Sequence, residues 1–389
     1  MPRNLKPEFL LDPGVFYLNH GSFGACPRPV FERYQAYQRE LELQPVDFIS
    51  NRLFPLLSKA RQVLAGYLGT VRENVVFVPN ATFGVNVIAR SLDLAAGDEI
   101  LATDHEYGAC DNAWSYLCRK SGARYIRRPV DLPVRTRAAF VDDFWAGVTE
   151  VTRVIYLSHI TSPTAVILPV EEICRRARAA GILTVIDGAH APGQIPLALD
   201  DLGADFYTGN CHKWMLSPKG AGFLYAHPRV QERVQPLVVS WGWSRQPGIA
   251  FESDFIDNQQ WLGTDDLSAY LAVPTAIEFM ADHDWPAVRA ACHELLGEAL
   301  AAVERLSGCE PVYTDDTFYA QMATTALPQL TDPQAFKRKM VETYQVEIPV
   351  TAWRDRHFLR ISIQGYNTGE DVGRLIDALR MQSVLSPGG

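Results

Sequence analysis

The segment Ile186–Tyr225, IDGAHAPGQIPLALDDLGADFYTGNCHKWMLSPKGAGFLY, contains the two side chains on which the fold prediction is centred, Asp187 and Lys213. Asp187 ends an apolar run of strand type, and Lys213 follows a second such run. A carboxylate at the end of a buried strand is costly unless it meets a cation or a hydrogen-bond donor. A lysine in apolar surroundings has a lowered pKa and becomes a nucleophile. The two residues therefore predict a polar site at one end of a buried sheet.

Outward from this segment, short apolar runs alternate with longer amphipathic stretches. Strands are predicted at Asn74–Pro79, Asp98–Ala102, Arg153–Ser158, Ile182–Asp187, Asp205–Thr208 and Gly222–Ala226. Helices are predicted between them at Thr82–Leu92, Ala109–Lys120 and Val170–Ala180. Strand–helix alternation with nearly continuous Val, Ile and Leu in the strands is typical of an α/β domain with a mostly parallel sheet.

After about Leu267 the pattern changes to longer helices with sparse strands. Helices are predicted at Ala269–Ala281, Pro286–Leu306, Pro333–Tyr344 and Gly369–Met381, with strands at Gln321–Leu327 and Phe358–Ser362. We therefore expect an N-terminal segment and a large α/β domain in residues 1–266, and a small α+β domain in residues 267–389. Two further helices, near Pro29–Leu43 and Pro55–Leu68, are expected to pack on one domain or at a partner interface.

The composition excludes several classes of protein. The 389 residues are 47% hydrophobic and 21% charged, as in an ordinary globular protein. Lys and Arg number 36 against 45 Asp and Glu, a balance that argues against binding to nucleic acid or an anionic membrane. The seven scattered cysteines form no CxxC, which argues against a disulfide framework and a structural zinc site. With no signal-peptide pattern and no long apolar run, a cytoplasmic enzyme is expected.

Polar residues follow five of the predicted strands, and ligands of doubly wound sheets bind outside the carboxyl ends of the strands. These residues are Asn80-Ala81-Thr82, His105-Glu106-Tyr107, Ser158–Thr161, Asp187–His190 and Asn210–Trp214. Taken alone, Lys213 is explained as a solvated surface lysine and Asp187 as a strand-end cap. Their joint occurrence at successive strand ends favours pyridoxal phosphate, which needs a lysine, a carboxylate for its ring nitrogen and a phosphate cup.

The segment Ile186–Tyr225 also resembles the core of the class V aminotransferases, which are fold type I pyridoxal-phosphate enzymes. Within that family it is most similar to the isopenicillin N epimerase-like branch, which is related to C–S lyases. Supporting motifs, in the same order along the chain, are LNHGSFGACP at 18–27, FVPNATFGVN at 77–86, SHITSPTAVILPV at 158–170, WLGTDDLSAYLAVPTAI at 261–277 and LRISIQGYNT at 359–368. The resemblance implies pyridoxal 5'-phosphate as the cofactor.

Matched position by position, the resemblance implies a role for each residue around the cofactor ring. Lys213 would form the Schiff base and act as acid and base at Cα. Asp187 would pair with the ring nitrogen, and His190 would lie near the phenolic oxygen. His105 matches the residue that stacks on the ring, although Tyr107 could take that place.

The phosphate cup is expected at the N-terminus of the predicted helix that follows Asn80. The amides of Ala81 and Thr82, with the Thr82 hydroxyl, would bind the phosphate there. Thr161, Asn210 and His212 complete the expected cofactor neighbours. In Gly263-Thr264, the threonine would reach the phosphate of a partner subunit, which implies a homodimer. The family usually has Arg after that Thr, whereas this chain has Asp265, which leaves the second half of the motif in question.

An amino-acid substrate is expected at the remaining matched positions. Arg360 matches the family's carboxylate anchor, because a planar guanidinium grips a carboxylate with two hydrogen bonds. Asn19, His20 and Tyr107 are expected near the substrate, although a turn before Gly21 explains the first two equally well.

The reaction stays open at this stage. We expect either β-elimination, as in C–S lyases, or epimerisation at Cα, with transamination as the alternative and a cofactor-binding regulator without turnover as a fourth possibility. A persulfide-forming desulfurase is disfavoured, because Tyr319–Leu327 and Val350–Arg360 contain no cysteine.

Overall fold

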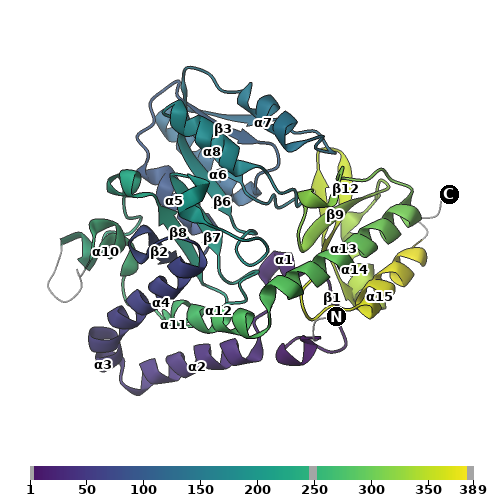
Figure 1. Ribbon diagram of the computed structural model, residues 1–389, viewed down its shortest axis with the longest axis horizontal. Coiled ribbons are helices and arrows are strands. Elements are labelled where there is room, and N and C mark those ends of the chain that lie inside the picture. The colour runs from purple at the N-terminus through teal and green to yellow at the C-terminus, as the bar shows by residue number, and fades with distance from the viewer. Residues whose placement is uncertain (1–3, 245–251, 383–389) are drawn as a thin grey trace.

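The computed structural model describes residues 4–244 and 252–382, which form a large and a small sheet with helices around them (Figure 1). The large sheet has seven strands in the order β2-β8-β7-β6-β5-β3-β4. Its strands are β2 (Val75–Val78), β3 (Glu99–Thr103), β4 (Arg124–Arg128), β5 (Thr152–Ser158), β6 (Leu183–Gly188), β7 (Phe206–Asn210) and β8 (Gly222–Ala226). Only β8 runs against its neighbours, so the predicted mostly parallel α/β sheet is confirmed.

Alternate residues of these strands face two separate cores. Ile155 and Ile186 pack in one core with α4 and α8, whereas Val154 and Val185 pack in the other with α5, α6 and α10. The helices of the large domain are α4 (Leu53–Tyr67), α5 (Ala81–Ser91), α6 (Gly108–Ser121), α7 (Arg137–Trp145), α8 (Val170–Ala179), α9 (Leu199–Leu202) and α10 (Asp254–Gln260). A sheet covered on both faces explains why its central strands are mostly apolar.

A second sheet, in the C-terminal third of the chain, is antiparallel with the order β11-β12-β9. Its elements are β9 (Met322–Leu327), β11 (Val350–Trp353), β12 (Arg356–Ser362), α13 (Trp285–Ser307), α14 (Pro333–Tyr344) and α15 (Gly369–Arg380). The predicted α+β character of this part is confirmed, and β11 is an addition to the predicted strands.

The N-terminal segment contacts both parts of the molecule. Its strand β1 (Phe16–Tyr17) pairs with β10 (Val346–Glu347) near the small sheet, and the short helix α1 (His20–Phe23) follows. Farther on, α2 (Arg28–Leu43) leads through α3 (Pro45–Asp47) toward the large domain. The boundary between residues 266 and 267 stays a prediction.

One helix prediction is wrong. The stretch Ala269–Ala281 forms two helices, α11 (Ser268–Leu271) and α12 (Val273–Asp282), instead of one. Pro274 lies in the first turn of α12, where its missing N–H costs nothing, and a proline there favours a new helix over a continued one. Both helices pack against α2 and α4.

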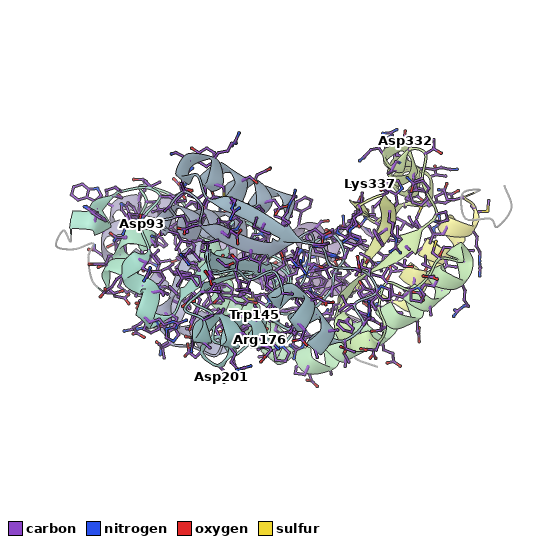
Figure 2. The ribbon with its side chains drawn as sticks, turned by 90° about the horizontal axis from the view of Figure 1, so that it is seen from above. Asp93, Trp145, Arg176, Asp201, Asp332 and Lys337 are labelled. Atoms are coloured by element: carbon purple, nitrogen blue, oxygen red, sulfur yellow. The ribbon has the colours of Figure 1, made fainter. Side chains whose placement is uncertain are left out.

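Charged residues lie on the outside of both parts, as Asp93, Asp201 and Asp332 do in Figure 2. No helix in the ranges 4–244 and 252–382 is long and apolar enough to cross a membrane.

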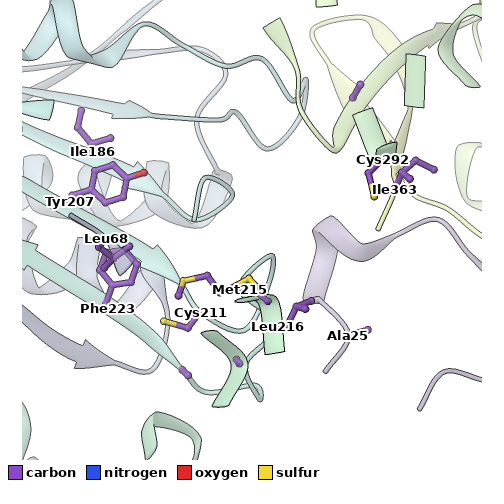
Figure 3. Packing of buried hydrophobic residues seen from close by; sticks show 14 of the residues in the cluster. Ala25, Leu68, Ile186, Tyr207, Cys211, Met215, Leu216, Phe223, Cys292 and Ile363 are labelled. Atoms are coloured by element: carbon purple, nitrogen blue, oxygen red, sulfur yellow. The ribbon is translucent and has the colours of Figure 1, made fainter. Parts of the chain in front are cut away.

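The loop after β7 is anchored by its apolar side chains. Cys211 and Met215 belong to the same core as Leu68 of the α4 end and Phe223 of β8 (Figure 3). Since Lys213 lies between the two anchored residues, its backbone is fixed at the end of the sheet.

Candidate active site

A cavity of about 500 Å³ opens at the carboxyl ends of β2, β3, β5, β6 and β7. Residues from five strand ends and from α1 line it, as the strand-end argument predicts. Its polar lining includes Thr82, Tyr107, Asp187, His190 and Lys213. These residues are far apart in the sequence and meet here because parallel strands end at one edge of the sheet.

Lys213 presents its side-chain nitrogen to this cavity. Nζ lies 3.2 Å from Nε2 of His190. Desolvation by the surrounding protein, with a smaller contribution from the nearby charge of Arg360, lowers the pKa of Lys213 to about 7, although Asp187 opposes the shift. A large part of the lysine is therefore the neutral, nucleophilic amine at neutral pH.

Asp187 lies at the end of β6 and is held by three donors. Its Oδ1 accepts from the backbone N–H of Ala189 at 2.8 Å, and its Oδ2 accepts from the hydroxyl of Tyr156 at 3.1 Å and from the thiol of Cys110 at 3.6 Å. Burial raises the pKa of Asp187, and these hydrogen bonds oppose that rise. A buried carboxyl beside the cavity would pair well with a protonated ring nitrogen.

The N-terminus of α5 forms another wall of the cavity. The side chain of Asn80 caps the helix by accepting from the N–H of Phe83 at 2.9 Å. The N–H of Ala81 donates to Oδ1 of Asn210 at 2.8 Å, so this amide is not the free phosphate donor that the sequence predicted. Asn210 instead holds the helix end against β7. Within the described ranges, no partner is found for the amide of Thr82, which leaves this group for an anion.

His212 also lines the cavity, but its ring is oriented by the backbone. Nδ1 lies 2.8 Å from the carbonyl oxygen of Ala221 and therefore carries the proton. Burial lowers the pKa of His212 to about 4. The neutral ring therefore presents Nε2 without a proton, and the donor role of His212 toward a phosphate stays a prediction.

Arg360 of β12 reaches the cavity rim from the small sheet. Nη1 donates to the carbonyl of Ser162 at 2.7 Å, and Nη2 donates to Oγ of Ser22 at 3.1 Å. Burial lowers the pKa of Arg360 to about 10, and its Nε has no hydrogen-bond partner among the described residues. A buried guanidinium with unused donor capacity beside two lining residues suits a carboxylate ligand.

The structure does not bring His105 to the cavity. Its Nδ1 lies 2.6 Å from the hydroxyl of Thr164 and its Nε2 lies 2.9 Å from the carbonyl oxygen of Val130, while the ring packs on Trp353. Tyr107, by contrast, lines the cavity with 48% of its surface exposed, and its stacking on the cofactor ring stays a prediction. His105 faces the other way because both ring nitrogens are satisfied inside the protein.

His20 and Asn19 are buried and are not among the residues that line the cavity. His20 is fully buried between the hydroxyl of Tyr366 and the carbonyl oxygen of Lys213, each 3.0 Å from a ring nitrogen, and burial lowers its pKa to about 3. Asn19 donates to Glu347 and accepts from Ser22 at 2.5 Å. Both residues are thus engaged within the protein, and their contact with a substrate stays a prediction.

Two of the three predicted threonines, Thr161 and Thr264, are not among the residues that line the cavity. The hydroxyl of Thr161 contacts Thr164 at 2.8 Å and accepts from the N–H of Val166 at 2.8 Å, so it closes a turn. Thr264 is exposed on the surface of the chain, as is Asp265. A contact of Thr264 with a partner's phosphate stays a prediction.

The sequence assigned no role to four residues of the site. Ser22 and Ser162 lie inside quoted motifs, yet a lone serine carries no chemical signal of its own. Tyr156 precedes the end of β5 by two residues, so it points to the same side of the sheet as Ser158, and strand alternation was the available clue. Trp214 follows Lys213 directly, and its contact with His190 depends on the folded loop.

The residues of the cavity fit pyridoxal phosphate. A partly neutral lysine amine, a buried carboxyl and an unengaged amide at a helix N-terminus line the same space. Asp187 would bind the cationic ring nitrogen of the cofactor, and the amide of Thr82 would bind its anionic phosphate. This donor set satisfies the three requirements of the cofactor.

Comparison with known proteins agrees with this geometry. The chain is 38% identical to isopenicillin N epimerase of Amycolatopsis lactamdurans, with 97% of each chain covered. It is 29% identical to putative L-cysteine desulfhydrase 1 of Oryza sativa subsp. japonica, covering 95% of this chain and 83% of the relative. In fold it is similar to a mutant of C-DES with glycine covalently linked to the PLP cofactor, with a TM-score of 0.84 and 21% identity over 98% of this chain and 100% of that one. The model of the family described as aminotransferase class-V matches residues 16–375, and the chain belongs to this family.

Proposed function

We propose that this protein is a pyridoxal-phosphate enzyme that breaks a bond at Cα of an amino-acid substrate. One observation carries the proposal: the partly neutral amine of Lys213, the buried carboxyl of Asp187 and the serines that hold Arg360 meet at one cavity. When bound, the cofactor supplies an electron sink that makes the bonds at Cα labile. Family membership and the epimerase and desulfhydrase relatives support an enzyme of this kind.

The residues of this chain would divide the work by position. Asp187 would hold a proton on the ring nitrogen, because its buried carboxylate is stabilised by a cation. Lys213 would bind the cofactor covalently and, once released, accept the proton from Cα at its Nζ. Arg360 would bind the substrate carboxylate and so fix which bond at Cα is broken.

We propose β-elimination of a sulfur leaving group as the first candidate reaction. It needs one acid–base group at Cα, and Lys213 supplies that group. Lys213 removes the Cα proton, the Cβ–S bond breaks, and the thiol leaves with the bonding electron pair and a proton. Water then hydrolyses the aminoacrylate product to pyruvate and ammonia. The similarity to an L-cysteine desulfhydrase supports this reaction.

Epimerisation is the second candidate, and the 38% identity to an isopenicillin N epimerase favours it. Inversion at Cα requires a proton donor on the face opposite the proton acceptor. Tyr107, which lines the cavity, is the residue proposed for that face.

We also propose a cytoplasmic homodimer. The seven cysteines are all free thiols, in keeping with a reducing compartment. Phe23 and Tyr107 line the cavity with 72% and 48% of their surfaces exposed, as expected if a second subunit covers the mouth. The proposed contact of Thr264 with the partner's phosphate agrees with this arrangement.

Product analysis tests the reaction. L-cysteine and S-substituted cysteines should give pyruvate and ammonia without a keto acid, and Lys213→Ala should abolish this. Lys219→Ala serves as the control, because this nearby lysine donates to the carbonyl of Gly24 instead of facing His190. Inversion at Cα with an intact carbon skeleton would show that the reaction is epimerisation and not elimination. A strict need for a keto acid would indicate transamination, and the lack of any spectral change with amino acids would indicate a regulator.

A further inference from the structure

Trp214 makes a hydrogen bond that the proposed reaction does not use. Its indole Nε1–H lies 3.3 Å from Nδ1 of His190, and both side chains are buried. An indole N–H can only donate, so Nδ1 of His190 must accept. Burial lowers the pKa of His190 well below its usual value, which keeps the ring neutral with a single N–H. That proton must therefore be on Nε2.

The other side of the ring shows what this proton does. Nε2 of His190 faces Nζ of Lys213 at 3.2 Å. With the proton on Nε2, the His190 ring donates to the lone pair of the neutral Lys213 amine. The contact therefore joins two neutral groups, and no repulsion between two cations opposes it. The ring would present the same N–H to an acceptor atom of a cofactor bound at Lys213.

Trp214 is itself held firmly in place. It packs with Ile160, Ala191 and Met322 in a small buried cluster, and the ring of His20 lies 4.8 Å from its own ring. A side chain that is fixed on several sides loses little entropy when it makes a hydrogen bond, so it can orient its partner.

We propose that Trp214 is a positioning residue that fixes His190 in the Nε2–H form and so keeps a hydrogen-bond donor directed at the Lys213 end of the cavity. This inference rests on the proposed function only for the identity of the acceptor. The protonation of the ring follows from the chain's own contacts and can be measured with or without the cofactor.

Nitrogen NMR of protein labelled with ¹⁵N-histidine tests the protonation directly, with His190→Gln identifying the resonances. We expect the proton on Nε2 in the full-length protein. In Trp214→Phe, the Nδ1 resonance should move downfield, because an unprotonated nitrogen loses its donor. A proton on Nδ1 in the wild type would overturn the proposal. This readout does not depend on activity, so failure of the proposed function would leave it intact.

A double-mutant cycle tests the consequence for the holoenzyme. Trp214→Phe should weaken cofactor binding several-fold, about as expected from the impaired orientation of one hydrogen bond. In the His190→Gln background the same change should have no effect, because an amide nitrogen always carries its protons. Trp285→Phe is the matched control, since this buried indole donates to the carbonyl of Gly193 at 3.1 Å and does not touch His190. Equal weakening by Trp214→Phe in both backgrounds, or none in either, would refute the positioning role.

Discussion

The side-chain nitrogen of Lys213 lies 3.2 Å from Nε2 of His190, and burial lowers the pKa of both groups. Two residues that are cationic in other settings are therefore in hydrogen-bond contact as an amine and an imidazole. The lowered pKa of Lys213, caused chiefly by desolvation, keeps the amine available for covalent chemistry at neutral pH. It also defines a pH range in which that availability changes.

We predict that cofactor attachment accelerates as the pH rises through 7. The pKa of Lys213 in the folded chain is about 7, lowered from 10.5 chiefly by desolvation, so the reactive neutral amine increases about tenfold between pH 6 and pH 8 and then levels off. The initial rate of absorbance change on adding pyridoxal phosphate to the cofactor-free protein measures this. A free lysine amide is the control, because its rate should keep rising above pH 9. A protein rate that also keeps rising above pH 9 would show that the lysine pKa is not lowered.

Replacing Asp187 by Asn should lower kcat/KM while preserving the volume of the side chain. We expect a loss of roughly 10- to 150-fold, which corresponds to one charged hydrogen bond of about 1.5–3 kcal/mol. Asp205→Asn is the control: Asp205 is equally buried, but it bonds to Thr184 at the start of β6, away from the cavity. It should reduce stability and leave kcat/KM nearly unchanged. Equal activity losses in the two variants would argue against a role of Asp187 at the cofactor ring.

Arg360→Lys should raise KM strongly with a smaller effect on kcat. A lysine keeps the charge but loses the planar pair of donors, so the substrate carboxylate would bind about 10- to 100-fold more weakly. Arg356→Lys is the control, because Arg356 lies on the same strand and its guanidinium packs over Phe358. Steady-state kinetics give KM and kcat for both variants. An unchanged KM in Arg360→Lys would show that Arg360 does not bind the substrate carboxylate.

Gly24→Ala should destabilise the protein and disturb the lysine loop. Gly24 has φ +70°, and a Cβ there would meet the carbonyl oxygen of His212 at 2.2 Å and Cα of Lys213 at 2.9 Å. The left-handed backbone costs about 1–2 kcal/mol and the clash about 1–3 kcal/mol more. Gly308→Ala separates the two effects, because Gly308 has φ +66° with nothing within 4 Å. Denaturant unfolding should show a larger loss of unfolding free energy for Gly24→Ala than for Gly308→Ala. Equal losses would mean that the lysine loop moves aside at no measurable cost.

The central strands were predictable because both faces of the sheet are covered. Each residue of β2, β3, β7 and β8 is buried, so apolar residues predominate in these strands and polar ones stand mainly at their ends. The edge strand β4, with the sequence RYIRR, was not found, because arginines on an edge give no apolar run. The pairing of β1 with β10 joins two-residue strands more than three hundred residues apart, and no local pattern indicates it.

The sequence predicted those site residues whose location follows from their position at the end of a strand. Asp187 and Lys213 follow buried strands, and parallel strands bring their carboxyl ends together. The direction of a side chain in a loop depends on its folded partners, which explains why His105 turned inward while Tyr107 faced the cavity. The amide of Ala81 was expected to be free, but Asn210, which is distant in sequence, engages it.

Covalent attachment of pyridoxal phosphate to Lys213 is tested by mapping the modified lysine. The purified protein, incubated with the cofactor, is reduced with borohydride, digested and analysed by peptide mass spectrometry alongside Lys213→Ala. We expect a visible absorbance band and a pyridoxyl-phosphate mass on the peptide that contains Lys213, both lost in the variant. A wild-type protein that acquires neither, or a label on another lysine that persists in Lys213→Ala, would contradict it.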